Sequence, residues 1–202
     1  MAKMKNAYTS DLWLASYDDY TIRGGYNWLR QSTPRISWWK ISWNVMNVPR
    51  TSFIYRADNL GRLLTRDRLA RMDGAPDMNC YLCQNATKSH SHLFFYCPLS
   101  SQCVSLLQAK LLVNFNPNAI AQWNSRGRRN NILRRRIVCA CHVHLTYLIW
   151  QVRNKTRLLQ QVIHPKVIAS QAVQGILSRF WARNFSAIPN SDEAWIRSCS
   201  LS

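Results

Sequence analysis

Two pairs of metal-ligating side chains lie close together in this chain and constrain its fold more than any other feature. Cys80 and Cys83 form a CxxC pair, and His92 and Cys97 form an HxxxxC pair within the stretch NCYLCQNATKSHSHLFFYC. Zinc prefers thiolate and imidazole ligands in a tetrahedron, and a CxxC turn supplies two of them at once. We therefore predict a Cys3His site for a Zn²⁺ ion that is structural, because four protein ligands leave no open position for catalysis.

The alternatives to this site are a different histidine ligand and buried cysteines without a metal. His90 competes with His92, but His92 directly precedes the apolar run Leu93-Phe94-Phe95, which would anchor it against a core. Seven cysteines are an odd number, and in a reducing compartment such a pattern indicates metal or buried thiols, not a disulfide scaffold. The second cluster, CACHVH, lies in a helical pattern in which Cys139, Cys141, His142 and His144 do not share one face, so we expect packing there.

The charge distribution points to a polyanion as the partner. The chain has 27 Lys and Arg against nine Asp and Glu, and no acidic residue lies between Met78 and Ser191. This interval carries 14 Lys and Arg, whose charge must be met by solvent ions, lipid headgroups or phosphates. A solvated basic face is the alternative, but over an interval this long we favour nucleic acid.

Catalysis and membrane insertion are not expected. The YDDY stretch at Tyr17–Tyr20 resembles a polymerase motif, but Ser16 occupies the position of its aromatic residue. A two-metal polymerase or nuclease site also needs further carboxylates around Mg²⁺, and the chain has none between Asp77 and Asp192. No Ser-His-Asp or Cys-His nucleophile pattern is present. The sequence also shows no membrane-length apolar run and no apolar block of a secretory signal. We expect an intracellular protein in a reducing compartment, with the mitochondrion favoured and the nucleus as the alternative.

Helical periodicity dominates the chain and predicts a mainly α fold organised around the zinc knuckle, with a long C-terminal helical hairpin. We divide the sequence into a segment 1–35 with a short strand at Tyr20–Ile22, a helical zinc-binding domain 36–115, a basic linker 116–130, a long basic helix and final helix 131–188, and a tail 189–202. Two helices broken near Gly61 are expected after Pro49. We expect Trp38, Trp39 and Trp43 in the core, because aromatics at helical spacing are usually buried and rarely form a base-stacking platform.

Several stretches together resemble a known family. The runs YTIRGGYNWLR, WWKISWNVMNVPRTSFIYRADNLGRLLTRDRLAR, CYLCQNATKSHSHLFFYCPLS and YLIWQVRNKTRLL are similar to the reverse transcriptase zinc-binding domain of plant LINE-type (non-LTR) retroelements. The resemblance runs from about Asp11 to Leu159 and implies zinc on Cys80, Cys83, His92 and Cys97. The endonuclease and polymerase that accompany this domain in a retroelement are missing here, which implies a stand-alone or host-recruited protein.

We therefore expect a non-catalytic, zinc-stabilised RNA-binding protein that is a structural component of a ribonucleoprotein, with a plant mitochondrial ribosome as one candidate. The expected partners are ribosomal or other structured RNA and ribonucleoprotein proteins, with no membrane and no small-molecule substrate. The alternatives are the C-terminal nucleic-acid-binding fragment of a retroelement reverse transcriptase, and a protein-interaction adaptor. The basic side chains predicted to contact RNA are Arg62, Arg66, Arg68, Arg71, Lys88, Arg126, Arg128, Arg129, Arg134, Arg135, Arg136, Arg153, Lys155 and Arg157.

Overall fold

The computed structural model describes residues 36–63, 79–80, 82–84, 92–126, 132–159, 163–183 and 188–201, without the side chains of 125–126, 157–159 and 201. Backbone packing divides the chain into two units, Met1–Ile36 and Ser37–Ser202, and the account below concerns the second. The segment 1–35 and the strand expected at Tyr20–Ile22 lie outside the described residues. Within the described ranges the regular structure is helical, so the prediction of a mainly α fold is confirmed.

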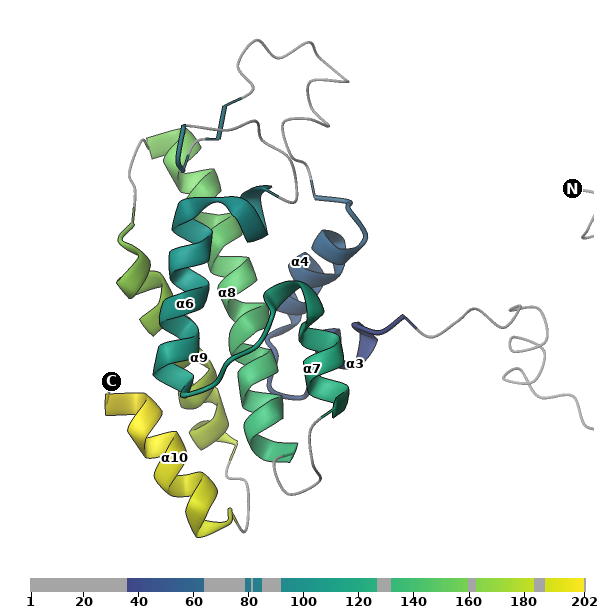
Figure 1. The fold of residues 1–202 in the computed structure, drawn as a ribbon, viewed down its shortest axis with the longest axis vertical. Coiled ribbons are helices and arrows are strands. Elements are labelled where there is room, and N and C mark those ends of the chain that lie inside the picture. Colours follow the sequence, from purple (N-terminus) through teal and green to yellow (C-terminus); the bar gives the residue numbers. More distant parts are fainter. Residues whose placement is uncertain are drawn as a thin grey trace, which may run out of the picture. The chain divides into compact units, whose positions relative to one another are not determined.

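The central element is α8 (Ile132–Leu159), a helix of 28 residues and therefore about 42 Å long. It packs against α3, α4, α6, α7 and α9 (Figure 1). Helical spacing predicts an apolar stripe on this helix, of which Ile137, Cys141, Leu145 and Val152 are buried and Leu133 and Leu148 are half-buried. The residues between Ile137 and Val143 are all buried, however, because neighbouring helices enclose α8 on more sides than a single stripe requires.

The predicted helical hairpin consists of α8 and α9 (Pro165–Ala182), which run in opposite directions and pack along each other (Figure 1). The turn into α9 is capped by His164, whose side chain accepts a hydrogen bond from the backbone N–H of Lys166. Helix α6 (Pro98–Leu111) packs on both α8 and α9. None of the described helices is long and apolar enough to cross a membrane.

On another side of α8 lie α3 (Trp39–Ser42) and α4 (Pro49–Asn59) (Figure 1). Helix α4 ends at Asn59, and Gly61 follows with a φ of +60°, so the predicted break near Gly61 is confirmed. The second helix expected after this glycine lies outside the described residues.

The prediction that the tryptophans belong to the core is wrong for two of them. Trp39 is 39% exposed and Trp43 is 68% exposed, whereas Trp38 packs partly against the core. Helix α3 is only four residues long and Trp43 is already its C-cap, so the helical spacing does not continue. The buried residues of this region are instead Ile41 and Met46.

Part of the predicted linker is helical. The turn η3 (Pro117–Ala119) leads into α7 (Ile120–Arg126), where we expected a linker over 116–130. The side chain of Asn116 accepts a hydrogen bond from the backbone N–H of Asn118 and thereby starts the turn. Ile120 is buried, and Trp123 packs at 5.8 Å from the ring of Phe115, which gives this short helix its apolar contacts.

The predicted tail 189–202 is also a helix, α10 (Asn190–Leu201). Its buried residues include Trp195 and Ile196, and the indole N–H of Trp195 donates a hydrogen bond to the carbonyl oxygen of Leu111 at 3.1 Å. Asp192 and Glu193 lie in the first turn, where carboxylates interact favourably with the helix dipole. The polar composition of the segment concealed these apolar positions.

Candidate metal centre

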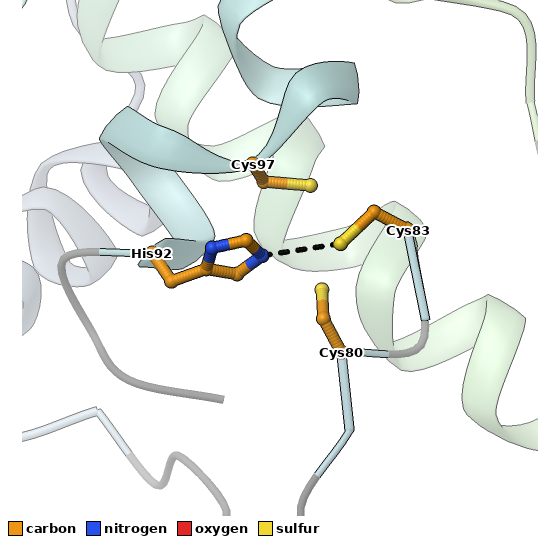
Figure 2. A group of neighbouring side chains, drawn as sticks. All are labelled: Cys80, Cys83, His92 and Cys97. Atoms are coloured by element: carbon orange, nitrogen blue, oxygen red, sulfur yellow. Dashed lines mark hydrogen bonds between the residues drawn. The ribbon is translucent and has the colours of Figure 1, made fainter. Parts of the chain in front are cut away.

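The CxxC half of the predicted site is a tight turn. The backbone N–H of Gln84 donates to the carbonyl oxygen of Cys80 at 2.7 Å. Gln84 has a φ of +58°, in the left-handed region that residues other than glycine rarely occupy. This turn brings the side chains of Cys80 and Cys83 to the same side (Figure 2).

The HxxxxC half is a single turn of π-helix, η2 (His92–Tyr96). The backbone N–H of Cys97 donates to the carbonyl oxygen of His92 at 2.7 Å, an i to i+5 bond that places the two side chains one wide turn apart. Cys97 is also the N-cap residue of α6, and its carbonyl oxygen accepts from the N–H of Ser101 at 2.9 Å. The second pair of ligands is therefore attached directly to a core helix.

Buried contacts hold the π-turn in place. Leu93 and Phe94 are buried in the core cluster, as expected for an apolar anchor next to the histidine. The hydroxyl of Ser100, fully buried in α6, donates to the carbonyl oxygen of Leu93 at 2.5 Å. The supporting role of Ser100 was not predicted from the sequence, although a serine three residues after the last cysteine of a knuckle is a position from which a hydroxyl can bond back to the turn.

The four predicted ligands come together at one point (Figure 2). Their ligand atoms all lie within 4.8 Å of one another, and Cys83 Sγ is 3.2 Å from His92 Nε2. A tetrahedral zinc ion with Zn–S bonds of about 2.3 Å requires S···S separations of about 3.8 Å. An adjustment of about 1 Å or less per pair, a contraction for the wider pairs and a small expansion for Cys83 and His92, reaches this geometry, so three sulfurs and one imidazole nitrogen fit a zinc ion in number and spacing.

The site also favours thiolate on one of its cysteines. The pKa of Cys80 is lowered, mainly because the Cys97 thiol donates a hydrogen bond to it; burial opposes this shift, and the backbone N–H groups of Leu82 and Cys83 support it. The same hydrogen bond and burial raise the pKa of Cys97. A lowered thiol pKa favours metal binding, since the thiolate is the form that binds a metal.

His92 points into the cluster, as predicted, and His90 lies outside the described residues. The cysteines and histidines of CACHVH do not form a comparable cluster of metal ligands within the described ranges. His142 is buried between the rings of Tyr55 and Phe115, at 6.0 and 5.6 Å in edge-on contacts. Burial raises the pKa values of Cys139 and Cys141, as expected for neutral packing thiols.

The predicted RNA-contacting side chains have different environments. Arg62, Arg136 and Lys155 are exposed. Arg134 is engaged by Asp192 at 2.6 Å and by the carbonyl oxygen of Ser191 at 2.7 Å, and Arg135 donates to the carbonyl oxygen of Asn124 at 2.5 Å. The remaining predicted positions lie outside the described residues or, for Arg126 and Arg157, in helices whose side chains there are not described: Arg66, Arg68, Arg71, Lys88, Arg126, Arg128, Arg129 and Arg157.

Arg153 requires a correction. It was expected on the exposed arginine face of the long helix, but it is only 6% exposed. The enclosure of α8 by its neighbours explains the difference, because positions off the predicted stripe are buried as well. We therefore remove Arg153 from the candidate contact set.

Comparison with known proteins concerns the segment that contains this cluster. No curated protein and no solved structure was found to match the chain. A family model does match, over residues 20–103, a range that includes all four clustered ligands. The resemblance is therefore confirmed for this segment: residues 20–103 match the family described as zinc-binding in reverse transcriptase.

Proposed function

We propose that this chain is a non-catalytic RNA-binding protein, stabilised by Zn²⁺ and serving as a structural component of a ribonucleoprotein. The observation that carries the proposal is the acid-free interval from Met78 to Ser191 with its 14 Lys and Arg. Of the three carboxylates in the described part, Asp58 is buried, and Asp192 and Glu193 form ion pairs with Arg134 and Arg197. Exposed cations therefore outnumber the carboxylates available to neutralise them.

The exposed cations suit phosphate groups in particular. Arg136 and Lys155 lie near opposite ends of α8 and face solvent. A rigid helix holds such side chains at fixed separations, so that they can follow a nucleic-acid backbone. Each neutralised phosphate releases counterions, which makes the affinity fall steeply with salt.

Zinc would have a structural role in this protein. With Cys80, Cys83, His92 and Cys97 as ligands, the ion would be closed to substrate and would cross-link the CxxC turn to the start of α6. The chemistry that zinc supplies when bound is coordination of these side chains. The chain's own residues do the rest: Leu93 and Phe94 anchor the π-turn in the core, and α6 connects it to α8 and α9.

RNA recovered with the protein tests the proposal directly. Tagged full-length protein is purified from cells, and the bound nucleic acid is sequenced after crosslinking. We expect a defined set of structured RNAs. A ribosomal RNA among them, with ribosomal proteins in the same fraction, would support a ribosome, and plant mitochondrial RNA would support the compartment. Recovery of no enriched RNA, or of DNA alone, would contradict the proposal.

A binding assay then tests the exposed cations. The double variant Arg136→Ala/Lys155→Ala should lower the slope of log affinity against log salt by about two, one for each phosphate contact. Arg197→Ala is the matched control, because Arg197 is exposed but is paired with Glu193 at 2.7 Å. An unchanged slope in the double variant would show that phosphates are bound elsewhere.

The family match supports a second candidate, a nucleic-acid-binding fragment of a reverse transcriptase. It predicts an upstream reading frame with polymerase motifs in the same transcript, and sequencing of that transcript decides between the two.

The adaptor alternative predicts protein partners whose binding hardly changes between about 50 and 200 mM salt. A protein that makes about six to ten phosphate contacts would instead lose about three to five orders of magnitude in affinity over this range.

A further inference from the structure

A cavity of about 350 Å³ opens to solvent where α3 ends and α4 begins. This size lies in the range of about 300–1,000 Å³ that is usual for small-ligand pockets. Its lining includes Ser42, Trp43, Asn47, Pro49, Phe53 and Arg56. The zinc ligands are not part of this lining, so the cavity is a separate feature of the molecule.

Two aromatic rings form the apolar part of the cavity. Trp43 is 68% exposed and Phe53 is 70% exposed, which are the values of surface residues and not of core aromatics. Exposed aromatic side chains that gather beside a pocket mark interaction sites more often than isolated surface residues do. Flat rings of this kind stack on nucleobases, and every base offers a π-face for such a contact.

Two lining residues carry buried polar atoms that lack hydrogen-bond partners within the described residues. Ser42 and Asn47 are 1% and 6% exposed, and Ser42 Oγ and Asn47 Oδ1 make no hydrogen bond there. The amide nitrogen of Asn47 donates to the carbonyl oxygens of Ile41 and Ser42 at 2.8 and 3.1 Å, which assigns the free atom of the amide as the oxygen. Both atoms are closed to solvent, so contacts with a ligand fall to the exposed side chains of the lining, Trp43, Phe53 and Arg56.

The charge around the cavity has one sign. Arg56 lines it, and Arg183 lies close by, donating to the carbonyl oxygen of Val45 at 2.6 Å. No carboxylate is among the described residues that line the cavity. A ligand with a flat ring and a negatively charged group would match the two aromatic rings and the guanidinium, and a nucleotide is such a ligand.

We propose that this cavity binds one nucleotide of single-stranded RNA. The base stacks on Trp43 and Phe53, and Arg56 contacts the phosphate. An apolar peptide side chain would bring no negative charge to Arg56, which disfavours a protein ligand. The base must be unpaired, because base edges and faces are not accessible in this way in an A-form duplex. The inference rests on the proposed RNA-binding function and names the part of the RNA that is recognised.

The test measures binding of a fluorescent single-stranded RNA oligonucleotide to the full-length protein by anisotropy, over a series of salt concentrations. Trp43→Ala and Phe53→Ala should each weaken binding about 5- to 150-fold, the range for loss of one base–aromatic stack, without changing the salt slope. Trp43→Phe should restore most of the affinity, and Arg56→Ala should lower the slope by about one. The matched control is Trp181→Ala, a tryptophan 40% exposed on α9 and outside the cavity lining.

Two further measurements make the test specific to a base. Ser42→Ala removes a lining hydroxyl that is closed to solvent and has no partner in the described part, so it should leave RNA binding unchanged and is a second control. An oligonucleotide with abasic sites should bind Trp43→Ala and wild type equally, because it has no base to stack.

The outcomes separate this inference from the proposed function. Affinity within twofold of wild type for both Trp43→Ala and Phe53→Ala, with the salt slope intact, overturns the nucleotide site and leaves the RNA-binding proposal standing. Equal loss in Trp181→Ala, or a loss that persists with abasic RNA, also overturns the site. A wild-type protein that binds no RNA overturns both.

Discussion

Replacing each histidine of the knuckle in turn tests whether the cluster is a metal site with the ligands assigned here. His92 Nε2 lies 3.2 Å from Cys83 Sγ and within 4.8 Å of every other ligand atom in the cluster. His90 is separated from it by one serine and is the matched control, since it has the same chemistry and almost the same place in the sequence. We expect His92→Ala to lose zinc and His90→Ala to keep it.

The magnitude follows from the number of ligands. Structural zinc sites of this type bind with an apparent free energy of about 10–16 kcal/mol, so one of four ligands carries on the order of 2.5–4 kcal/mol. This corresponds to a loss in affinity of about 10²- to 10³-fold for His92→Ala. Because zinc binds the folded and not the unfolded chain, the loss should also appear as a lower melting temperature.

The measurement is zinc affinity by competition with a chelating dye under reducing conditions, together with thermal unfolding. Wild type treated with excess chelator should melt at or below the temperature of His92→Ala with zinc, because the chelator removes the metal cross-link between the CxxC turn and α6 whereas the variant only weakens it. The reasoning is refuted if His90→Ala loses the metal and His92→Ala does not. It is also refuted if wild type binds no zinc, since the cluster would then be a set of packed thiols.

Three further predictions concern the fold that carries the site. A Cβ on Gly175 of α9 would lie 2.4 Å from Cε1 of His144 on α8, so Gly175→Ala should be unfavourable in wild type but stabilising by about 1 kcal/mol in His144→Ala. A double-mutant cycle by urea unfolding should give a coupling energy of about 1–3 kcal/mol, and additive effects would contradict the close approach. Burial lowers the pKa of His142 to about 4, whereas the histidine of the unfolded chain titrates near 6.5. As the pH falls below about 6.5, the unfolded state is therefore protonated before the folded state, and the free energy of unfolding should decrease until about pH 4. The loss between pH 7 and pH 5 should be about 2 kcal/mol smaller in His142→Phe, and equal losses would contradict the buried neutral histidine. Arg134→Ala should cost about 1–3 kcal/mol in denaturant unfolding by leaving the buried Asp192 carboxylate without this partner, whereas an equally stable variant would assign the pair no structural role.

The sequence predicts the features that depend on spacing. The ligand set could be predicted because a structural zinc site requires four donors, and CxxC followed by HxxxxC supplies four within one short stretch. Helix α8 could be predicted because its apolar residues repeat at helical spacing over about eight turns. The spacing does not predict that His92–Tyr96 forms a turn of π-helix. This turn depends on tertiary contacts, namely the burial of Leu93 and Phe94 and the hydrogen bond from the Ser100 hydroxyl.

The predictions that differ from the structure concern short helices, which are stabilised mainly by contacts with neighbouring helices. Among its described side chains, helix α10 has three buried apolar positions, Trp195, Ile196 and Cys199, in a segment whose polar composition is typical of a tail. Helix α7 is seven residues long, below the length at which periodicity is informative. Trp43 was misassigned because the spacing rule assumes that a helix continues, and α3 ends there.

The arginine cluster Arg134-Arg135-Arg136 shows why a basic run in a sequence is not yet a binding surface. Arg134 lies 5.4 Å above the ring of Trp195 and pairs with Asp192, so its charge fixes α10 against α8. Arg135 holds the carbonyl oxygen of Asn124 and connects α8 to α7. Arg136 is exposed, and its backbone carbonyl accepts from the side chain of Asn44 at 2.7 Å, close to the segment that lines the nucleotide cavity. A single run of three arginines therefore positions two helices and leaves one guanidinium for solvent or phosphate, which is why we separate Arg136 from its neighbours in the binding experiments.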